Sequence, residues 1–113
     1  MEQLGQPSLG GYRVALSAAG HRIEISDSAV TVDDMVQALS PATMAILRAL
    51  ALRPGCVVAR SELLRALPGS AADPHAVDTA ILRLRKALGD RNIVVTVVKR
   101  GYRLAIDENP DAA

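Results

Sequence analysis

The feature that most constrains this chain is a helix with well-defined ends over residues 73–89. Asp73 is a preferred N-cap residue, Pro74 suits the first helical position, and Gly89 stands where a left-handed C-cap belongs. With about 3.6 residues per turn, five apolar side chains fall on one face of this helix. They are Val77, Ala80, Ile81, Leu84 and Leu88. The pattern predicts a helix that packs this face against a core.

The opposite face of the same helix is polar and basic, with His75, Thr79, Arg83 and Lys86. Arg83 and Lys86 are three residues apart, so one can reach a base edge of DNA while the other holds a phosphate. Arginine can bind a guanine edge with two hydrogen bonds and lysine cannot, which favours Arg83 as the base reader. Thr79 could touch a thymine methyl group, whereas His75 could bind a phosphate or be ordinary surface. On an isolated helix, such a face is more often simply solvated.

A basic hairpin follows this helix. Residues 93–98 form a β-branched run and residues 102–106 a shorter one, joined by Lys99, Arg100 and Gly101. Three connecting residues that include glycine are typical of a tight hairpin. The two cations at its tip could enter the minor groove of DNA or bind its phosphates. The alternative is a charged tip that only keeps the hairpin soluble and blocks edge pairing.

The rest of the chain predicts a small antiparallel sheet followed by two helices. Residues 12–39 contain short β-type runs separated by turns, and a serine–proline pair starts a helix over 41–53. Residues 56–58 are extended, and 60–67 form a second, short helix. The predicted fold class is therefore α+β: a winged helix-turn-helix with an N-terminal antiparallel sheet, three helices and a C-terminal β-hairpin as the wing. In such a plan, the third helix is the one that can enter a major groove.

The predicted domain organisation has three parts. Residues 1–11 are rich in glycine without apolar periodicity, so we expect a flexible lead-in or linker. Residues 12–106 form a single winged-helix domain, and residues 107–113 form a frayed tail. Residues 75–106 hold seven Lys or Arg against two Asp, and the remaining chain is net negative. This asymmetry predicts that any polyanion binds the C-terminal half.

Four further side chains receive predicted roles. Arg60 and Ser61 open the second helix, whose first amide groups could hold a phosphate. Arg85 is expected to play a structural role by reaching Asp78 or the wing. Two roles are open to Leu82: contact with a thymine methyl group, or packing under the loop 68–72, which we favour.

Composition excludes several classes of function. Only two aromatic residues are present, both tyrosines, which disfavours a mechanism based on stacking of bases. Cys56 is the single cysteine, so neither an internal disulfide nor a thiolate metal cluster can form. No cluster of carboxylates, histidines or glycines has the spacing of an enzyme, metal or cofactor site, so we expect no enzyme activity, metal or cofactor in this chain. Neither a membrane span nor a secretory signal is recognisable, which predicts a cytoplasmic protein.

The order of these motifs resembles the OmpR/PhoB-type winged-helix DNA-binding domains of bacterial response regulators, the transcription factors of two-component systems. The matching segments are residues 39–41, 54–64, 77–78, 81, 83–86, 88–89, 96–97 and 101–104. This chain departs from the family at Val98, where the wing usually carries an arginine, and at Ala59, where a serine or threonine usually caps the second helix. A missing cap costs about 1 kcal/mol of helix stability.

The resemblance implies sequence-specific binding of double-stranded DNA in transcription regulation. It also implies contact with RNA polymerase through the loop 68–72, and tandem pairing on DNA. No dimer seam is recognisable in the sequence, so we expect the isolated domain to be a monomer. The competing interpretation is a protein-interaction module whose basic face binds an acidic partner. There is also a narrower resemblance, to actinobacterial proteins in which the winged helix follows a uroporphyrinogen-III synthase domain. It lies in the amino-acid sequence of residues 75–77 and 96–104.

Overall fold

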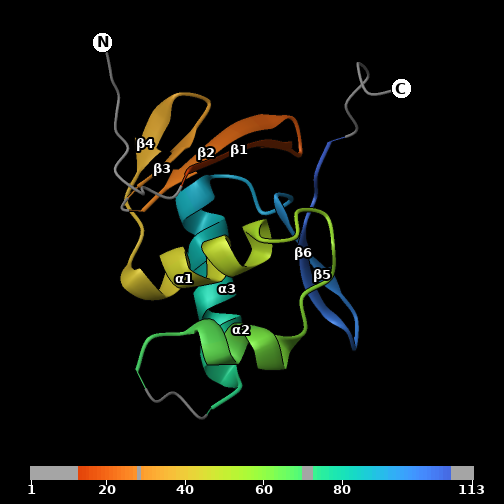
Figure 1. The fold of residues 1–113 in the computed structure, drawn as a ribbon. Coiled ribbons are helices and arrows are strands. Elements are labelled where there is room, and N and C mark those ends of the chain that lie inside the picture. Colours follow the sequence, from red (N-terminus) through yellow and green to blue (C-terminus); the bar gives the residue numbers. More distant parts are fainter. Residues whose placement is uncertain (1–12, 28, 70–72, 108–113) are drawn as a thin grey trace.

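The structure, a computed structural model, describes residues 13–27, 29–69 and 73–107 (Figure 1). The elements are β1 (Arg13–Ala18), β2 (His21–Ser26), β3 (Val30–Val32), β4 (Met35–Gln37), α1 (Pro41–Ala51), α2 (Arg60–Ala66), α3 (His75–Leu88), β5 (Val94–Val97) and β6 (Gly101–Leu104). This order confirms the predicted α+β fold class. The lead-in predicted for residues 1–11, and residues 108–113 of the tail, lie outside the described residues. Among the described helices, none is long and apolar enough to cross a membrane.

The N-terminal sheet is antiparallel in the order β1-β2-β3-β4. On β2, Ile23 and Ile25 are buried and Arg22 and Glu24 are exposed, as their alternation predicts. The sheet lies across the end of α3 that is far from α2 (Figure 1). Its apolar face therefore closes one end of the core.

Local capping explains where the longer helices begin and end. The Ser40 hydroxyl accepts a hydrogen bond from the Thr43 N–H at 3.2 Å and so caps α1. At α3, the Asp73 carboxylate accepts one from the His75 N–H at 2.9 Å, and Gly89 ends the helix with φ 84°. By contrast, Ala59 gives α2 no side-chain cap. The Gly89 C-cap predicted for α3 is confirmed, whereas the helix begins at His75, one residue later than predicted, with Pro74 before it in helical conformation.

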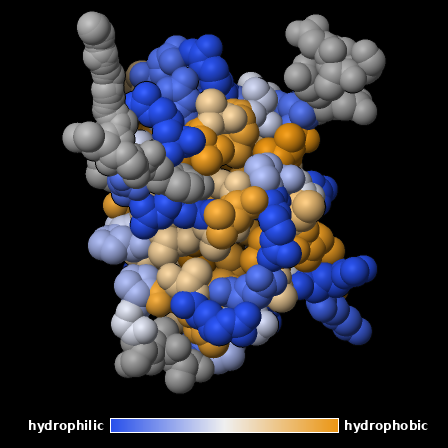
Figure 2. Space-filling view, in the orientation of Figure 1, coloured by the Kyte–Doolittle hydropathy of each residue, from blue (hydrophilic) through white to orange (hydrophobic). Residues whose placement is uncertain are grey.

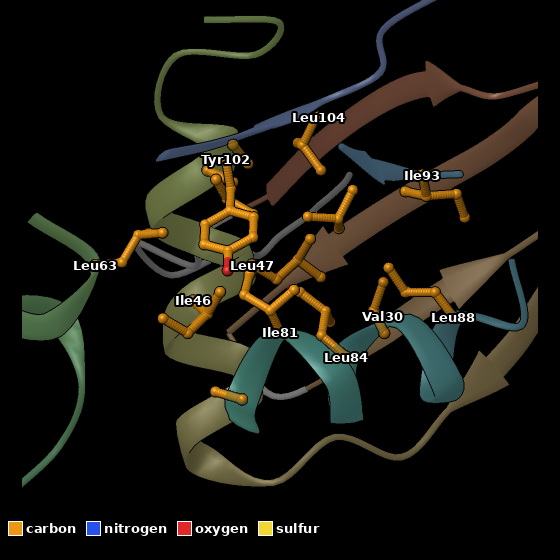
Figure 3. Close-up of a cluster of buried hydrophobic side chains, with 14 of the residues drawn as sticks. Val30, Ile46, Leu47, Leu63, Ile81, Leu84, Leu88, Ile93, Tyr102 and Leu104 are labelled. Atoms are coloured by element: carbon orange, nitrogen blue, oxygen red, sulfur yellow. The ribbon is translucent and has the colours of Figure 1, made fainter. Parts of the chain in front are cut away.

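The core forms where α3 meets α1 beneath the sheet. All five side chains of the predicted apolar face of α3 are at most 5% exposed, which confirms that face. Figure 3 shows Ile81 and Leu84 of α3 close to Ile46 and Leu47 of α1, and Leu88 beside Val30 of β3. These aliphatic side chains are among the most buried of the described residues. Their burial fixes α3 so that its opposite face is turned outward.

The wing is the hairpin of β5 and β6, and its loop is shifted by one residue from the prediction. Val97 pairs with Gly101, so the loop consists of Val98, Lys99 and Arg100. Gly101 is the first residue of β6. It must be glycine because the strand passes very close to Val58: a Cβ atom on Gly101 would lie 2.1 Å from the Val58 carbonyl oxygen. Two backbone hydrogen bonds join Val58 to Tyr102, the next residue of β6. The Val58 N–H donates to the Tyr102 carbonyl at 2.8 Å, and the Tyr102 N–H donates to the Val58 carbonyl at 3.1 Å. The segment between α1 and α2 therefore anchors the wing.

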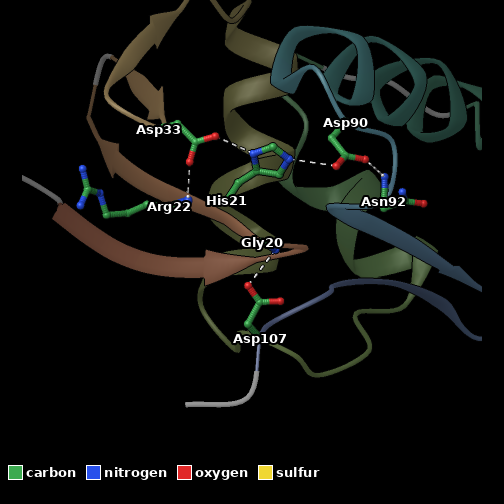
Figure 4. A network of polar contacts seen from close by, with 7 residues as sticks. All are labelled: Gly20, His21, Arg22, Asp33, Asp90, Asn92 and Asp107. Atoms are coloured by element: carbon green, nitrogen blue, oxygen red, sulfur yellow. Dashed lines mark hydrogen bonds and ion pairs between the residues drawn. The ribbon is translucent and has the colours of Figure 1, made fainter. Parts of the chain in front are cut away.

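A histidine ties the N-terminal sheet to the turn after α3 (Figure 4). The His21 ring lies between two carboxylates, with Nδ1 2.6 Å from Asp33 and Nε2 2.9 Å from Asp90. Hydrogen bonding to Asp33, and then to Asp90, raises the pKa of His21. No local pattern in the sequence predicts this bridge, because the two partners of His21 are 12 and 69 positions away.

The C-terminal end of the domain is held to the first hairpin. The Asp107 carboxylate accepts a hydrogen bond from the Gly20 N–H at 2.8 Å, and the Asp107 N–H donates to the Ser17 carbonyl at 2.9 Å. The sequence predicts that Asp107 begins the frayed tail. The structure instead fixes it to β1 and the β1–β2 turn, so the ordered domain reaches at least this residue.

Candidate nucleic-acid interface

The outer face of α3 carries the four polar residues predicted from the sequence, and each of them is exposed: His75, Thr79, Arg83 and Lys86. Arg83 and Lys86 form no ion pair with any described residue. The His75 imidazole is 86% exposed, with Nδ1 4.0 Å from the Asp78 carboxylate. The cationic side chains of this face are therefore available to a ligand.

The wing tip, residues 98–100, adds two further cations. Lys99 and Arg100 are exposed, and Lys99 adopts a left-handed conformation with φ 65°. The turn is closed by the Arg100 N–H, which donates to the Val97 carbonyl at 2.9 Å. In Figure 2, hydrophilic side chains project from the lower right of the molecule, where Figure 1 shows the end of the wing. The charges are thus carried away from the body of the domain.

One carboxylate on α3 connects the helix to both α2 and the wing. Asp78 accepts a hydrogen bond from the Tyr102 hydroxyl at 2.7 Å and forms an ion pair with Arg60. The bond from Tyr102, followed by the contact with Arg60, lowers the pKa of Asp78. Burial first, and then the neighbouring Asp78, raises the pKa of Tyr102. Arg60, predicted as a phosphate contact, therefore has a structural partner that the sequence analysis did not foresee.

A second connection runs from α3 to β5 through Arg85. Its guanidinium donates to the Val94 carbonyl from Nε at 3.0 Å and from a terminal nitrogen at 2.8 Å. It also donates to the Thr96 hydroxyl at 2.9 Å and lies 5.9 Å from the centre of the Tyr102 ring. The structural role predicted for Arg85 is confirmed. These contacts fix the position of the wing relative to the outer face of α3.

A groove of about 700 Å³ lies between α3 and β5. It is lined by Leu82, Arg85, Lys86, Gly89, Arg91, Asn92, Val94, Val95 and Thr96. Leu82 is 55% exposed here, so the favoured prediction that it packs under the loop 68–72 is wrong. Pro68 of that loop lines a different hollow, on the side of α3 that carries Thr79 and Arg83.

The structure brings the predicted residues together in three places. His75, Thr79 and Arg83 border a hollow of about 350 Å³ at the start of α3, Lys86 lines the α3–β5 groove, and the two wing cations lie at the tip. Ser61 is exposed on α2 and lines neither hollow. Arg91, an exposed cation in the α3–β5 turn, could not be predicted from sequence, because a turn has no periodicity that shows which way its side chains point.

Three helices, a hairpin packed beside the third helix and a cationic surface shared by the two define a winged helix-turn-helix module. Residues 34–104 match the model of the family described as transcriptional regulatory protein, C terminal. The chain belongs to this family.

Individual relatives support the same placement. The chain is 31% identical over 91 residues to the transcriptional regulatory protein CutR of Streptomyces coelicolor, and the match covers 79% of this chain and 42% of CutR. The chain thus spans less than half the length of that relative. The Klebsiella pneumoniae RstA DNA-binding domain, solved in complex with the RstA box, is 30% identical with a TM-score of 0.68, and the match covers 82% of this chain and 96% of that one.

A third similarity bears on the resemblance inferred from the sequence. The response regulator DrrB, described as a Thermotoga maritima OmpR/PhoB homologue, is 30% identical with a TM-score of 0.65. The match covers 74% of this chain and 41% of that one. The resemblance to OmpR/PhoB-type domains is confirmed.

Proposed function

We propose that this domain binds double-stranded DNA to regulate transcription, with α3 in the major groove and the wing on the minor groove or its phosphates. The observation that carries the proposal is the fixed pairing of two exposed cationic surfaces, the outer face of α3 and the wing tip, by Arg85 and Asp78. Cations at fixed positions are what phosphate binding requires. The RstA domain, which has the same fold, was solved with DNA.

Each residue of the outer face of α3 has a proposed role. Arg83 reads a guanine edge and Lys86 neutralises a phosphate, because only the guanidinium can donate two parallel hydrogen bonds to guanine. Thr79 touches a base edge, where its methyl group suits thymine, and His75 approaches a phosphate at the start of the helix. All four side chains are exposed, which permits these contacts.

The remaining predicted contacts lie outside α3. Lys99 and Arg100 bind the minor groove or its phosphates, and Ser61 lies near a phosphate at the start of α2. For Arg60 we propose mainly a positioning role, since its ion pair with Asp78 holds α2 against α3. Its guanidinium is still half exposed, so a phosphate could share it.

The test is a titration of a labelled random duplex with the domain at several salt concentrations, followed by fluorescence anisotropy. Non-specific binding should have a dissociation constant of about 10⁻⁴ to 10⁻⁶ M and weaken steeply with salt, because each neutralised phosphate releases counterions. Lys86→Ala and Lys99→Ala should each weaken binding, and each lost phosphate contact should reduce the slope of log K against log salt by about 1.

A matched control is Arg13→Ala, which removes the same charge from an exposed position on β1 in the N-terminal sheet. It should leave both affinity and slope close to those of the wild type. Equal effects of the three substitutions would show that only net charge matters and would refute the proposed surface. Absence of binding at low salt would favour the competing interpretation, a module that binds an acidic protein partner.

Two finer proposals rest on the family resemblance. Relatives of this type suggest contact with RNA polymerase through the loop 68–72 and tandem pairing of monomers on direct repeats. Pro68 and Gly69 are exposed, whereas residues 70–72 lie outside the described residues. Pro68→Glu should then reduce binding of RNA polymerase to the DNA-bound domain without changing affinity for DNA. Sedimentation of the domain with and without a duplex that carries two binding sites tests the tandem pairing.

We also propose a cytoplasmic location, because the bacterial chromosome that the domain would bind lies in the cytoplasm.

The parent protein is a further proposal. The amino-acid sequence of residues 75–77 and 96–104 supports the proposal that the parent is an actinobacterial protein in which a uroporphyrinogen-III synthase domain precedes this one. CutR likewise extends well beyond the matched region. Sequencing the genomic region upstream of this segment decides the question, and a receiver domain found there would contradict the synthase proposal.

A further inference from the structure

A leucine occupies the middle of the outer face of α3. Leu82 follows Thr79 by three residues and precedes Lys86 by four, so the three side chains lie along one line of the helix. Leu82 is 55% exposed, and it is the single large apolar side chain exposed on α3 as the structure describes it. Its position is central to the proposed interface, between residues whose proposed partners are DNA groups.

The surroundings of Leu82 leave it uncovered by the domain itself. It borders the α3–β5 groove, whose other members include Lys86, Arg91 and Thr96. Neither cation is ion-paired within the described ranges. When these cations bind phosphates, the middle of α3 would lie against base edges. The Leu82 side chain would then be desolvated at the interface.

The chemistry of the base edges limits what this side chain can face. Most positions in the major groove present hydrogen-bond donors or acceptors, and covering them with an apolar group leaves them unsatisfied at a cost. The C5-methyl group of thymine is the apolar exception. An exposed leucine at this place therefore favours thymine and disfavours purines.

We infer that Leu82 is a specificity-determining residue that contacts the C5-methyl group of a thymine in the bound site. The inference rests on the proposed binding of DNA by α3. It assigns to Leu82 a role separate from that of Thr79, one helical turn away, which would face a different base.

The experiment uses a site selected by the wild-type domain from random duplexes. Each thymine in the selected site is replaced in turn by deoxyuridine, which lacks only the methyl group. The wild type should bind about threefold to fivefold more weakly when the thymine opposite Leu82 is replaced, the effect of one desolvated methyl group. In Leu82→Ala this difference should vanish at that thymine and persist at any thymine read by Thr79.

Val36→Ala is the matched control, because Val36 is also an exposed aliphatic residue, 72% exposed, but lies on β4 in the N-terminal sheet. It should keep the full pattern of deoxyuridine effects, as should Leu82→Met, which retains an apolar side chain. A wild type that is insensitive to deoxyuridine throughout, or a Leu82→Ala variant with the wild-type pattern, would overturn the inference. If wild-type binding to random duplex DNA is intact in that case, the proposed function survives; if that binding is absent, the proposed function itself fails.

Discussion

Replacing Gly101 with alanine would place a Cβ atom 2.1 Å from the backbone oxygen of Val58, and 2.8 Å from its carbonyl carbon. Both neighbours are backbone atoms, so neither can turn aside as a flexible side chain would. Gly101 also has φ 143°, a conformation that residues with a Cβ atom rarely adopt. The substitution must therefore move β6 away from Val58.

The cost can be worked from the contacts that would be lost. Two backbone hydrogen bonds join Val58 and Tyr102, and each contributes about 1 kcal/mol net. The unfavourable φ adds about 1–2 kcal/mol. Partial exposure of Tyr102, which is now 8% exposed, adds to this. We expect Gly101→Ala to lower the free energy of unfolding by about 3–5 kcal/mol.

Gly89→Ala is the control for this prediction. Gly89 has φ 84°, but a Cβ atom there would meet nothing within 4 Å, so only the conformational cost of about 1–2 kcal/mol applies. Urea unfolding followed by circular dichroism measures both variants. Equal destabilisation by the two substitutions would refute the argument that close approach to Val58 fixes the wing.

Two further predictions concern polar groups that join the elements. Tyr102→Phe removes the hydroxyl that donates to Asp78, and should lower the free energy of unfolding by about 1–2 kcal/mol and raise the pKa of Asp78, measurable by urea unfolding and by NMR titration. The pKa of His21 is raised, so its bonds to Asp33 and Asp90 stabilise the fold fully below its unfolded pKa of 6.5, and that contribution is lost as pH rises through the higher folded value. The melting temperature of the wild type should therefore fall, relative to that of His21→Asn, as the pH rises above 6.5; parallel melting profiles would contradict the bridge.

The periodic parts of the structure could be predicted from sequence. The apolar face of α3, its Gly89 end and the alternation on β2 all follow from local spacing and backbone preference, and all are confirmed. The structural role of Arg85 likewise follows from its place on the helix, which directs its side chain toward Asp78 or the wing. Such features depend on residues within one element, which is why the chain reveals them.

Features that join distant segments could not be predicted in the same way. His21 and Asp90 are 69 positions apart, and Tyr102 and Asp78 are 24 apart, so no local pattern links them. Gly101 was predicted as a turn residue, whereas its glycine is required by the approach of Val58 from another element. The exposure of Leu82 likewise depends on where β5 lies, which the helix alone does not determine.

The measurement that tests the central claim most directly is an NMR titration of the isotope-labelled domain with a DNA duplex at low salt. Amide signals of α3 from His75 to Arg83, and those of the wing tip, should shift on binding. Signals of the acidic N-terminal sheet, such as those of Glu24 and Thr31, should stay in place. Shifts centred on β1–β4, or no shifts at all, would contradict the account.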